Sequence, residues 1–176
     1  NDGTWTGQGQ NPLEWLENNP LKYKKYKMIS TGFADLTLYR NLVFRSQFAV
    51  DFSHTTGFSQ SFPDYEPNLG EGSAGRSSSD ALGLHLTNTL TYRFDVDNIH
   101  DFNFLLGHEW QDYHLEAFSV TTAGQTNSKL TDISNGTRAT SWTSTADSDY
   151  SRVSFFGRGE YNYADRYYAE VSVRTD

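Results

Sequence analysis

The sequence has no cysteine among its 176 residues, which excludes disulfide bonds and cysteine-ligated metal sites. Positive charge is also scarce, because 14 Lys and Arg stand against 22 Asp and Glu, giving a formal charge of −8. Affinity for nucleic acid comes largely from cationic side chains, so this balance argues against a nucleic-acid partner. The lysines of residues 22–27 are too few to change it, and we interpret them as part of a solvated connector.

Long apolar runs are missing as well. No stretch approaches the ~20 apolar residues that a membrane-spanning helix requires, and mean hydropathy is −0.68, yet aromatic residues make up 15% of the chain. Strands of a transmembrane β-barrel reconcile these numbers, because they alternate lipid-facing apolar with lumen-facing polar residues. The chain does not start with a charged segment and an apolar run, as a signal peptide does, so we expect a mature form or an internal fragment.

Apolar and polar residues alternate with a period of two along most of the chain. The clearest segments are residues 42–53 and 82–96, in which every second residue is mostly Leu, Phe, Val or Tyr. Weaker alternation brings the number of expected strands to six, with the others at residues 28–39, 102–120, 152–163 and 167–175. A strand of fifteen residues is long for a globular protein, where about 5–6 is usual, and suits a tilted membrane strand.

The expected connections alternate in length. Short polar turns at residues 40–41, 97–100 and 164–166 close three hairpins, and long links rich in Ser, Thr, Gly and Asn, at 54–81 and 121–151, join them. Outer-membrane barrels have this pattern of short and long connections at opposite ends. We therefore predict an all-β fold, an antiparallel up-and-down meander of six strands that forms a section of a large transmembrane β-barrel. Its strands occupy residues 26–176, after an irregular lead-in over residues 1–25.

Two local features accompany this pattern. Within the lead-in, residues 13–16 are expected to form a helical turn, with Asn11 as its cap and Pro12 at its first position. Aromatic residues gather beside the short turns, where we favour an interfacial girdle over ordinary cross-strand pairing. These aromatic residues are Tyr39, Tyr92, Phe94, Phe102, Tyr161, Tyr163, Tyr167 and Tyr168.

The polar faces of the strands supply the candidate binding residues. In a barrel they line the lumen, and the alternative is surface charge on a soluble sheet. The lumen-facing candidates are Arg45, Gln47, Asp51, His85, Arg93, Glu109, Gln111, Arg158, Glu160, Glu170 and Arg174. Aromatic rings in the long loops are candidates for contact with substrate, with loop anchoring as the alternative. They are Phe58, Phe62, Tyr65 and Trp142.

No pattern predicts catalysis, a cofactor or a metal. His108 and His114 are separated by about 20 Å if they share a strand, so they do not share one ion. Glu109 and Glu160 qualify as a carboxylate pair for glycoside hydrolysis only at a separation of about 5–9.5 Å, which the sequence does not set. We predict a protein that is not an enzyme.

The C-terminal run Tyr168-Ala-Glu-Val-Ser-Val-Arg-Thr-Asp176 resembles a barrel strand of the SusC/RagA family of TonB-dependent receptors. Residues 155–167 are similar to the hairpin that precedes it, and residues 11–13 and 42–53 also resemble the family. The resemblance implies an internal section of a barrel of about 22 strands in the bacterial outer membrane. It further implies import of a glycan or peptide ligand, contact with outer-membrane lipid, a SusD-like lipoprotein partner that covers the barrel, and energy supplied through TonB.

A soluble β-sandwich that binds carbohydrate is the alternative, since six strands, acidic charge and loop aromatics suit such a module. If the chain is a barrel section, its outer strands, near residues 28 and 175, carry open edges. Open edges recruit other strands, so we expect the isolated fragment to self-associate.

Overall fold

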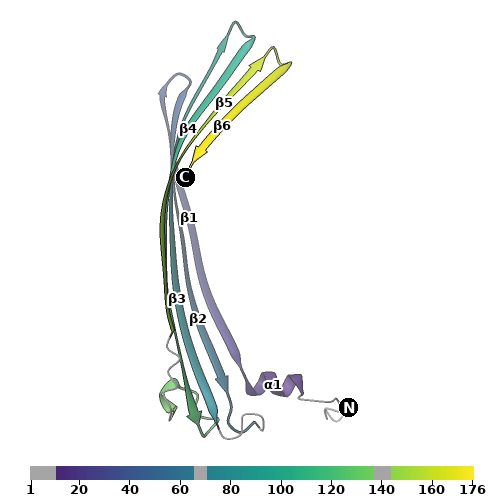
Figure 1. Cartoon of the computed structure of the whole chain (residues 1–176), viewed down its shortest axis with the longest axis vertical. Coiled ribbons are helices and arrows are strands. Elements are labelled where there is room, and N and C mark those ends of the chain that lie inside the picture. The colour runs from purple at the N-terminus through teal and green to yellow at the C-terminus, as the bar shows by residue number, and fades with distance from the viewer. Residues whose placement is uncertain (1–10, 66–70, 137–143) are drawn as a thin grey trace. The chain divides into compact units, whose positions relative to one another are not determined.

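The computed structural model describes residues 11–65, 71–136 and 144–176 (Figure 1). The elements, in chain order, are α1 (Pro12–Asn18), β1 (Leu21–Tyr39), β2 (Leu42–Ser61), β3 (Gly72–Val96), β4 (His100–Gln125), the 3-10 turn η2 (Ile133–Asn135), β5 (Ser144–Tyr163) and β6 (Tyr167–Thr175). The strands form one sheet in the order β1-β2-β3-β4-β5-β6, so each pairs with its neighbours in the chain. This confirms the six-stranded antiparallel meander, and one sheet replaces the two that a sandwich requires.

The strands are longer than the sequence pattern suggested. β1 begins at Leu21, so the lysines of residues 22–27 belong to a strand, and their interpretation as a connector was wrong. β2 and β3 extend into residues 54–81, and β4 and β5 extend into residues 121–151, which shortens both expected loops. Pairing with a neighbouring strand holds these Ser- and Thr-rich ends extended, because sheet context outweighs the weak strand preference of single residues.

The lead-in contains the predicted helix. The side chain of Asn11 accepts a hydrogen bond from the backbone N–H of Leu13 at 3.0 Å. Pro12 occupies the first helical position, where a backbone N–H would have no partner within the helix, so its absence costs nothing. Just after the helix, the carbonyl of Pro20 accepts from the backbone N–H of Gln60 at 3.1 Å. The lead-in is therefore hydrogen-bonded to the end of β2.

Two of the short turns use left-handed backbone. Asp97 and Asn98 have φ of 58° and 52°, and Ala164 and Asp165 have φ of 52° and 54°. Two successive residues at positive φ give a turn whose twist matches that of the flanking strands. Asp and Asn adopt this conformation readily, but Ala does so at a cost.

Contacts divide the chain into two compact units that share the strands. Unit 1 comprises residues 1–26, 53–80 and 115–147, and unit 2 comprises residues 27–52, 81–114 and 148–176. Unit 1 holds α1, η2 and the long connections, whereas unit 2 holds the three short turns.

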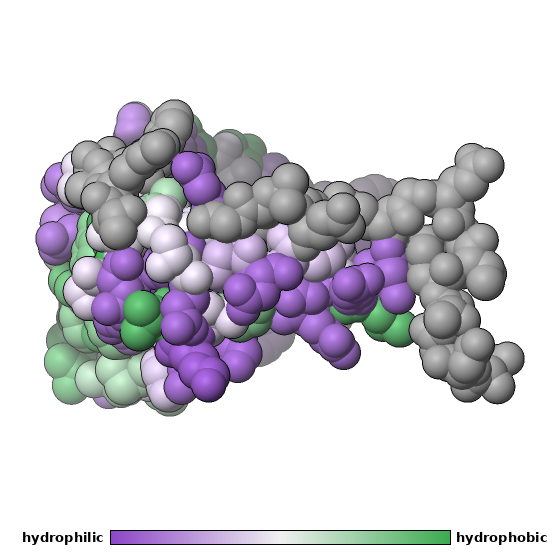
Figure 2. Space-filling view, turned by 90° about the horizontal axis from the view of Figure 1, so that it is seen from below, coloured by the Kyte–Doolittle hydropathy of each residue, from purple (hydrophilic) through white to green (hydrophobic). Residues whose placement is uncertain are grey.

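Few apolar side chains of the described residues are buried. Only Tyr65 and Ala74 are buried hydrophobic residues there. The chain exposes 12606 Å², whereas roughly 8,700 Å² is typical of a globular protein of its mass. None of the helices within the described ranges has the length and apolar character needed to cross a membrane. Figure 2 shows hydrophilic residues beside separate hydrophobic areas on the surface seen from below.

The aromatic residues beside the short turns form a continuous row in unit 2. Phe94 of β3 stacks on Phe102 of β4, Phe102 lies against Tyr161 of β5, and the ring centroids are 4.9 Å apart in both pairs. Tyr163 and Tyr167 extend the row into β6 at 6.3 Å. The expected clustering is thus present for these residues of β3 to β6, and its role as an interfacial girdle stays a prediction.

Tyr168 does not belong to that row. Tyr167 pairs with Tyr163 in the β5–β6 register, and Tyr168 pairs with Asn162. Since successive side chains of a strand point to opposite faces, Tyr168 lies on the other face of the sheet. Its assignment to the girdle was wrong.

Candidate functional site

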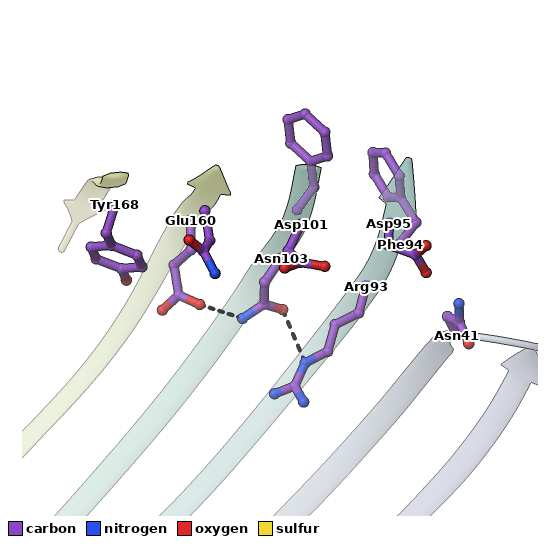
Figure 3. A pocket seen from close by; sticks show the side chains of 10 residues that line it. Asn41, Arg93, Phe94, Asp95, Asp101, Asn103, Glu160 and Tyr168 are labelled. Carbon is purple, nitrogen blue, oxygen red and sulfur yellow. Dashed lines mark hydrogen bonds between the residues drawn. The ribbon is translucent and has the colours of Figure 1, made fainter. Parts of the chain in front are cut away.

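A row of hydrogen-bonded polar side chains crosses three strands of unit 2. Nε of Arg93 in β3 donates to Oδ1 of Asn103 in β4 at 3.2 Å, and Nδ2 of Asn103 donates to Oε2 of Glu160 in β5 at 2.5 Å (Figure 3). The amide therefore links a cation to an anion with one donor and one acceptor. Because each residue comes from a different strand, the row ties β3, β4 and β5 together on this face.

The row borders a shallow hollow of about 330 Å³. Asp95, Asp101 and Tyr168 are among its other lining residues. In Figure 3 the ring of Phe94 points away from the row, whereas the side chain of Arg93, its neighbour in the chain, points into it. At this level the sheet has one polar face and one aromatic face.

A second polar group surrounds Arg174 of β6. Its Nη1 donates to Oε2 of Glu109 in β4, and its Nη2 donates to Oγ of Ser154 in β5, both at 3.2 Å. The amide of Gln111 donates to the other carboxylate oxygen of Glu109. Arg174 also lies over the ring of Phe156, 5.8 Å from its centroid.

A third group joins β1 to β2. Arg45 donates through Nε and Nη2 to the two carboxylate oxygens of Asp35, at 2.6 and 2.7 Å, which is the bidentate geometry that a guanidinium favours. Nζ of Lys27 lies 3.0 Å from Oδ2 of Asp51. Solvent screens ion pairs that remain this exposed, so their main effect is to orient the side chains.

The predicted polar residues share one face. Arg45, Arg93, Glu109, Glu160 and Arg174 all take part in contacts between strands. Alternation along each strand gives the same orientation to the remaining six candidates, which are Gln47, Asp51, His85, Gln111, Arg158 and Glu170. The structure therefore brings these residues to one surface, and their position in a barrel lumen remains a prediction.

Asn103 and Tyr168 were absent from the predicted set although both line the hollow. A signal for Asn103 was present, because alternation within residues 102–120 puts Asn103 on the same face as Glu109 and Gln111. Alternation within residues 167–175 puts Tyr168 on the face of Glu170, to which its hydroxyl donates at 3.0 Å.

The candidate loop aromatics have different surroundings. Phe58 lies within β2 and not in a loop. The guanidinium of Arg76 lies over its ring, at a distance of 4.2 Å from the centroid. Tyr65 is only 7% exposed, which leaves little of its ring for a ligand. Phe62 follows β2, where its backbone N–H donates to the carbonyl of Asn18. Trp142 lies outside the described residues.

The residues considered for catalysis have separate partners. His108 lies against Phe155, with ring centroids 5.1 Å apart, and His114 lies 2.5 Å from Asp149. Glu160 is bound by Asn103, which lies six residues from Glu109 along β4, about 20 Å, so the two carboxylates do not form a facing pair. Within the ranges that the structure describes, no group of three or more His, Asp or Glu is arranged to hold a metal ion.

Long strands, a polar face linked by hydrogen bonds and an apolar face that none of the described segments covers define a section of a transmembrane β-barrel wall. No family model matches the sequence. The chain is 26% identical to TonB-dependent receptor P26 of Formosa agariphila over 188 residues, which cover 99% of this chain and 19% of that receptor.

Comparison with solved structures also finds similarity to a transporter. The RagAB peptide transporter is 26% identical and superposes with a TM-score of 0.84 over 90% of this chain and 18% of the other. The RagAB peptide importer in an open-open state gives a TM-score of 0.83. The chain thus spans about a fifth of the length of its relatives. These similarities confirm the resemblance to SusC/RagA-type TonB-dependent receptors, and the relatives carry the names of receptors and transporters.

Proposed function

We propose that this chain is part of the barrel wall of a bacterial outer-membrane receptor that imports a nutrient, either a peptide or a glycan. The observation that carries the proposal is the similarity to the RagAB peptide transporter over 90% of the chain. In this role the apolar face of unit 2 contacts lipid and the polar face borders the lumen.

The chemistry of the polar face suits passage of a polar solute. Its charges are of both signs, and several are paired with one another, as Arg45 is with Asp35 and Arg174 with Glu109. A wall of this kind offers donors and acceptors in many places without binding one charged group tightly. Conduction requires such weak, repeated contacts, because a solute held strongly at one point is released slowly.

The remaining parts of the proposal come from the relatives. We infer that TonB supplies the energy for import and that a SusD-like lipoprotein covers the barrel. Regions outside this chain would hold the plug and the segment that contacts TonB. This chain would contribute strands of the barrel wall, whose apolar face contacts lipid and whose polar face borders the transport path.

The test is growth of the source bacterium without the gene for the whole receptor, on defined peptide mixtures or glycans as the limiting nutrient. Loss of growth on one nutrient class, restored by the intact gene, supports the proposal and selects between peptide and glycan. A second strain lacking TonB should show the same defect. Unchanged growth and unchanged uptake of labelled peptides and glycans in the receptor-deficient strain would contradict the proposal.

A further inference from the structure

Unit 1 carries a cluster of three cationic side chains on neighbouring strands. Lys22 and Lys24 of β1 and Arg76 of β3 line a hollow of about 390 Å³ together with Phe58 of β2. We call these four residues the basic patch. The patch stands out because the chain as a whole has a charge of −8.

The basic patch lies on a defined face of its strands. A side chain placed at Gly57 would meet Oγ of Ser77 and the ring of Tyr23, so these three positions share one face. Because side chains alternate, Lys22, Lys24, Phe58 and Arg76 emerge on the opposite face.

In β2, Phe58 points to the same side of the strand as a series of apolar side chains. Phe58 has the same parity as Phe48, Val50 and Phe52, and it lies further along the strand towards the long connection. In the proposed receptor the apolar series faces lipid, and long connections lie at the outer end of barrels of this class. Alternation along β2 therefore assigns Phe58, and with it the basic patch, to the side of the strand that carries the apolar series, next to the long connection.

The cations of the basic patch are free to bind an anionic ligand. In the part of the chain that the structure describes, neither Lys22 nor Lys24 has an ion pair. Arg76 stacks on Phe58 and donates through Nη1 to the carbonyl of Gly75 and through Nη2 to that of Thr131, at 3.0 and 3.2 Å. These contacts fix the guanidinium and leave its charge uncompensated by them.

One carboxylate, that of Asp132, acts electrostatically on the patch through Arg76. Asp132, whose charge acts on Arg76, accepts a hydrogen bond from the backbone N–H of Ser134 at 2.9 Å. Three cations beside one aromatic ring outnumber this single carboxylate, so the patch suits a group that is both anionic and partly apolar.

We propose that the basic patch binds the phosphate of a phosphorylated glycolipid in the outer leaflet, a lipopolysaccharide. The inference rests on the proposed function, because only that function turns this face towards the bilayer. Lys22, Lys24 and Arg76 supply charge-assisted hydrogen bonds to phosphate oxygens. Phe58 supplies an apolar surface for the sugar or acyl part. An acidic protein would have to reach a face that is turned to lipid, so a lipid is the occupant that fits.

The experiment uses the whole receptor, purified from outer membranes. A patch variant, Lys22→Gln with Lys24→Gln and Arg76→Gln, is compared with a control variant, Lys25→Gln with Arg40→Gln and Arg166→Gln. Both lose three positive charges, but the control charges lie outside the patch. Native mass spectrometry measures the affinity for lipid A carrying its phosphates and for lipid A from which they have been removed.

The patch variant should bind phosphorylated lipid A roughly a hundredfold more weakly, which corresponds to three basic residues beside an anionic membrane. The control variant should stay within about twofold of the parent protein, as surface charges elsewhere act weakly. Phosphate-free lipid A should bind all three proteins equally and weakly. Equal affinities of patch and control variants for the phosphorylated lipid would overturn the proposal.

A further outcome would also overturn it. If the patch variant melts earlier than the control in lipid-free detergent, the cations pair with acidic residues of a neighbouring strand. Uptake assays separate this failure from that of the proposed function. A receptor that imports its nutrient but binds lipid equally in both variants lacks only the lipid site, whereas one that is absent from the outer membrane fails the proposed function itself.

Discussion

Arg174 of β6 reaches Glu109 of β4 across the intervening strand, with 3.2 Å between Nη1 and Oε2. The strand between them, β5, carries Ser154 at the crossing point, which is 1% exposed and also accepts from the guanidinium. A small residue there lets the long side chain pass over the strand. The contact thereby fixes three strands on the polar face.

The first prediction concerns this contact. Arg174→Ala should destabilise the receptor only slightly, because the side chains of Arg174 and Glu109 are 45% and 19% exposed and solvent weakens the pair. Arg166→Ala in the last turn removes the same charge and should have a smaller effect. A double-mutant cycle with Glu109→Gln, from urea unfolding in detergent micelles, isolates the interaction energy. A coupling energy of zero would show that the contact does not stabilise the barrel.

The second prediction separates the two faces of β3. Leu86 lies on the apolar face and Thr87 on the polar face, so Leu86→Arg and Thr87→Arg place the same side chain on opposite sides. Leu86→Arg should destabilise the membrane-embedded receptor by about 2–4 kcal/mol, the cost of Arg on the lipid face near the bilayer midplane. Thr87→Arg should change stability by less than about 1 kcal/mol. Unfolding in lipid vesicles measures both, and equal costs would contradict the assignment of faces.

The third prediction concerns the last short turn. Ala164 has a φ of 52°, a conformation that glycine adopts without the steric cost that a Cβ brings. Ala164→Gly should stabilise the β5–β6 hairpin by about 1 kcal/mol. The matched control is Ala169→Gly within β6, which should destabilise it, since glycine weakens a strand. Hydrogen exchange of the amides in the hairpin measures the local free energy of opening, and faster exchange in Ala164→Gly would count against the turn geometry.

The fourth prediction is a pH dependence at η2. The backbone N–H of Ser134, the largest contribution, lowers the pKa of Asp132 below its ordinary value, with help from the Ser134 hydroxyl and Arg76. A lowered pKa means that the cap stabilises the turn above the pKa of the unfolded chain, about 3.9. That stabilisation is lost as pH falls through the lower pKa of the folded state. Protection of the Ser134 amide should therefore stay constant from pH 7 to about pH 5 and decrease below about pH 4.

Asp132→Asn and Asp132→Ala serve as controls for this effect. Asparagine caps a turn without titrating, so protection should be independent of pH, whereas alanine should lower it throughout. Hydrogen exchange corrected for the intrinsic pH dependence distinguishes the three proteins. An unchanged pH profile in Asp132→Asn would assign the effect to another group.

The fifth prediction concerns the isolated chain. Its edge strand β6 exposes Val171 by 76% and Val173 by 71%, and open edges and apolar faces associate in water. The purified fragment should self-associate, and Val171→Lys with Val173→Lys should lower the association. Ser172→Lys, on the polar face of the same strand, should act less. Sedimentation velocity reports the state, and a monodisperse monomer of the unaltered fragment would refute the prediction.

The sequence predicted much of the candidate site, because its residues are fixed by local alternation. Arg45 and Glu160 could be assigned to the polar face without knowing their partners. The partners themselves depend on register, which the turns set over many residues. Arg174 reaches Glu109 only because β6, β5 and β4 align so that Ser154 lies between them. No pattern within one strand contains that information.

The sequence by itself determined the period of two, the succession of short and long connections and therefore the six-stranded meander. Each of these is encoded in neighbouring residues, since a strand exposes every second side chain to the same surroundings. Only the tertiary structure decided where the strands end. Phe58 and Lys22, assigned from composition to a loop and a connector, lie in strands, because hydrogen bonds to an adjacent strand hold a segment extended whatever its own preference. The same pairing brought Lys22, Phe58 and Arg76 together from three strands, an arrangement that residues distant in the chain acquire only when the sheet forms.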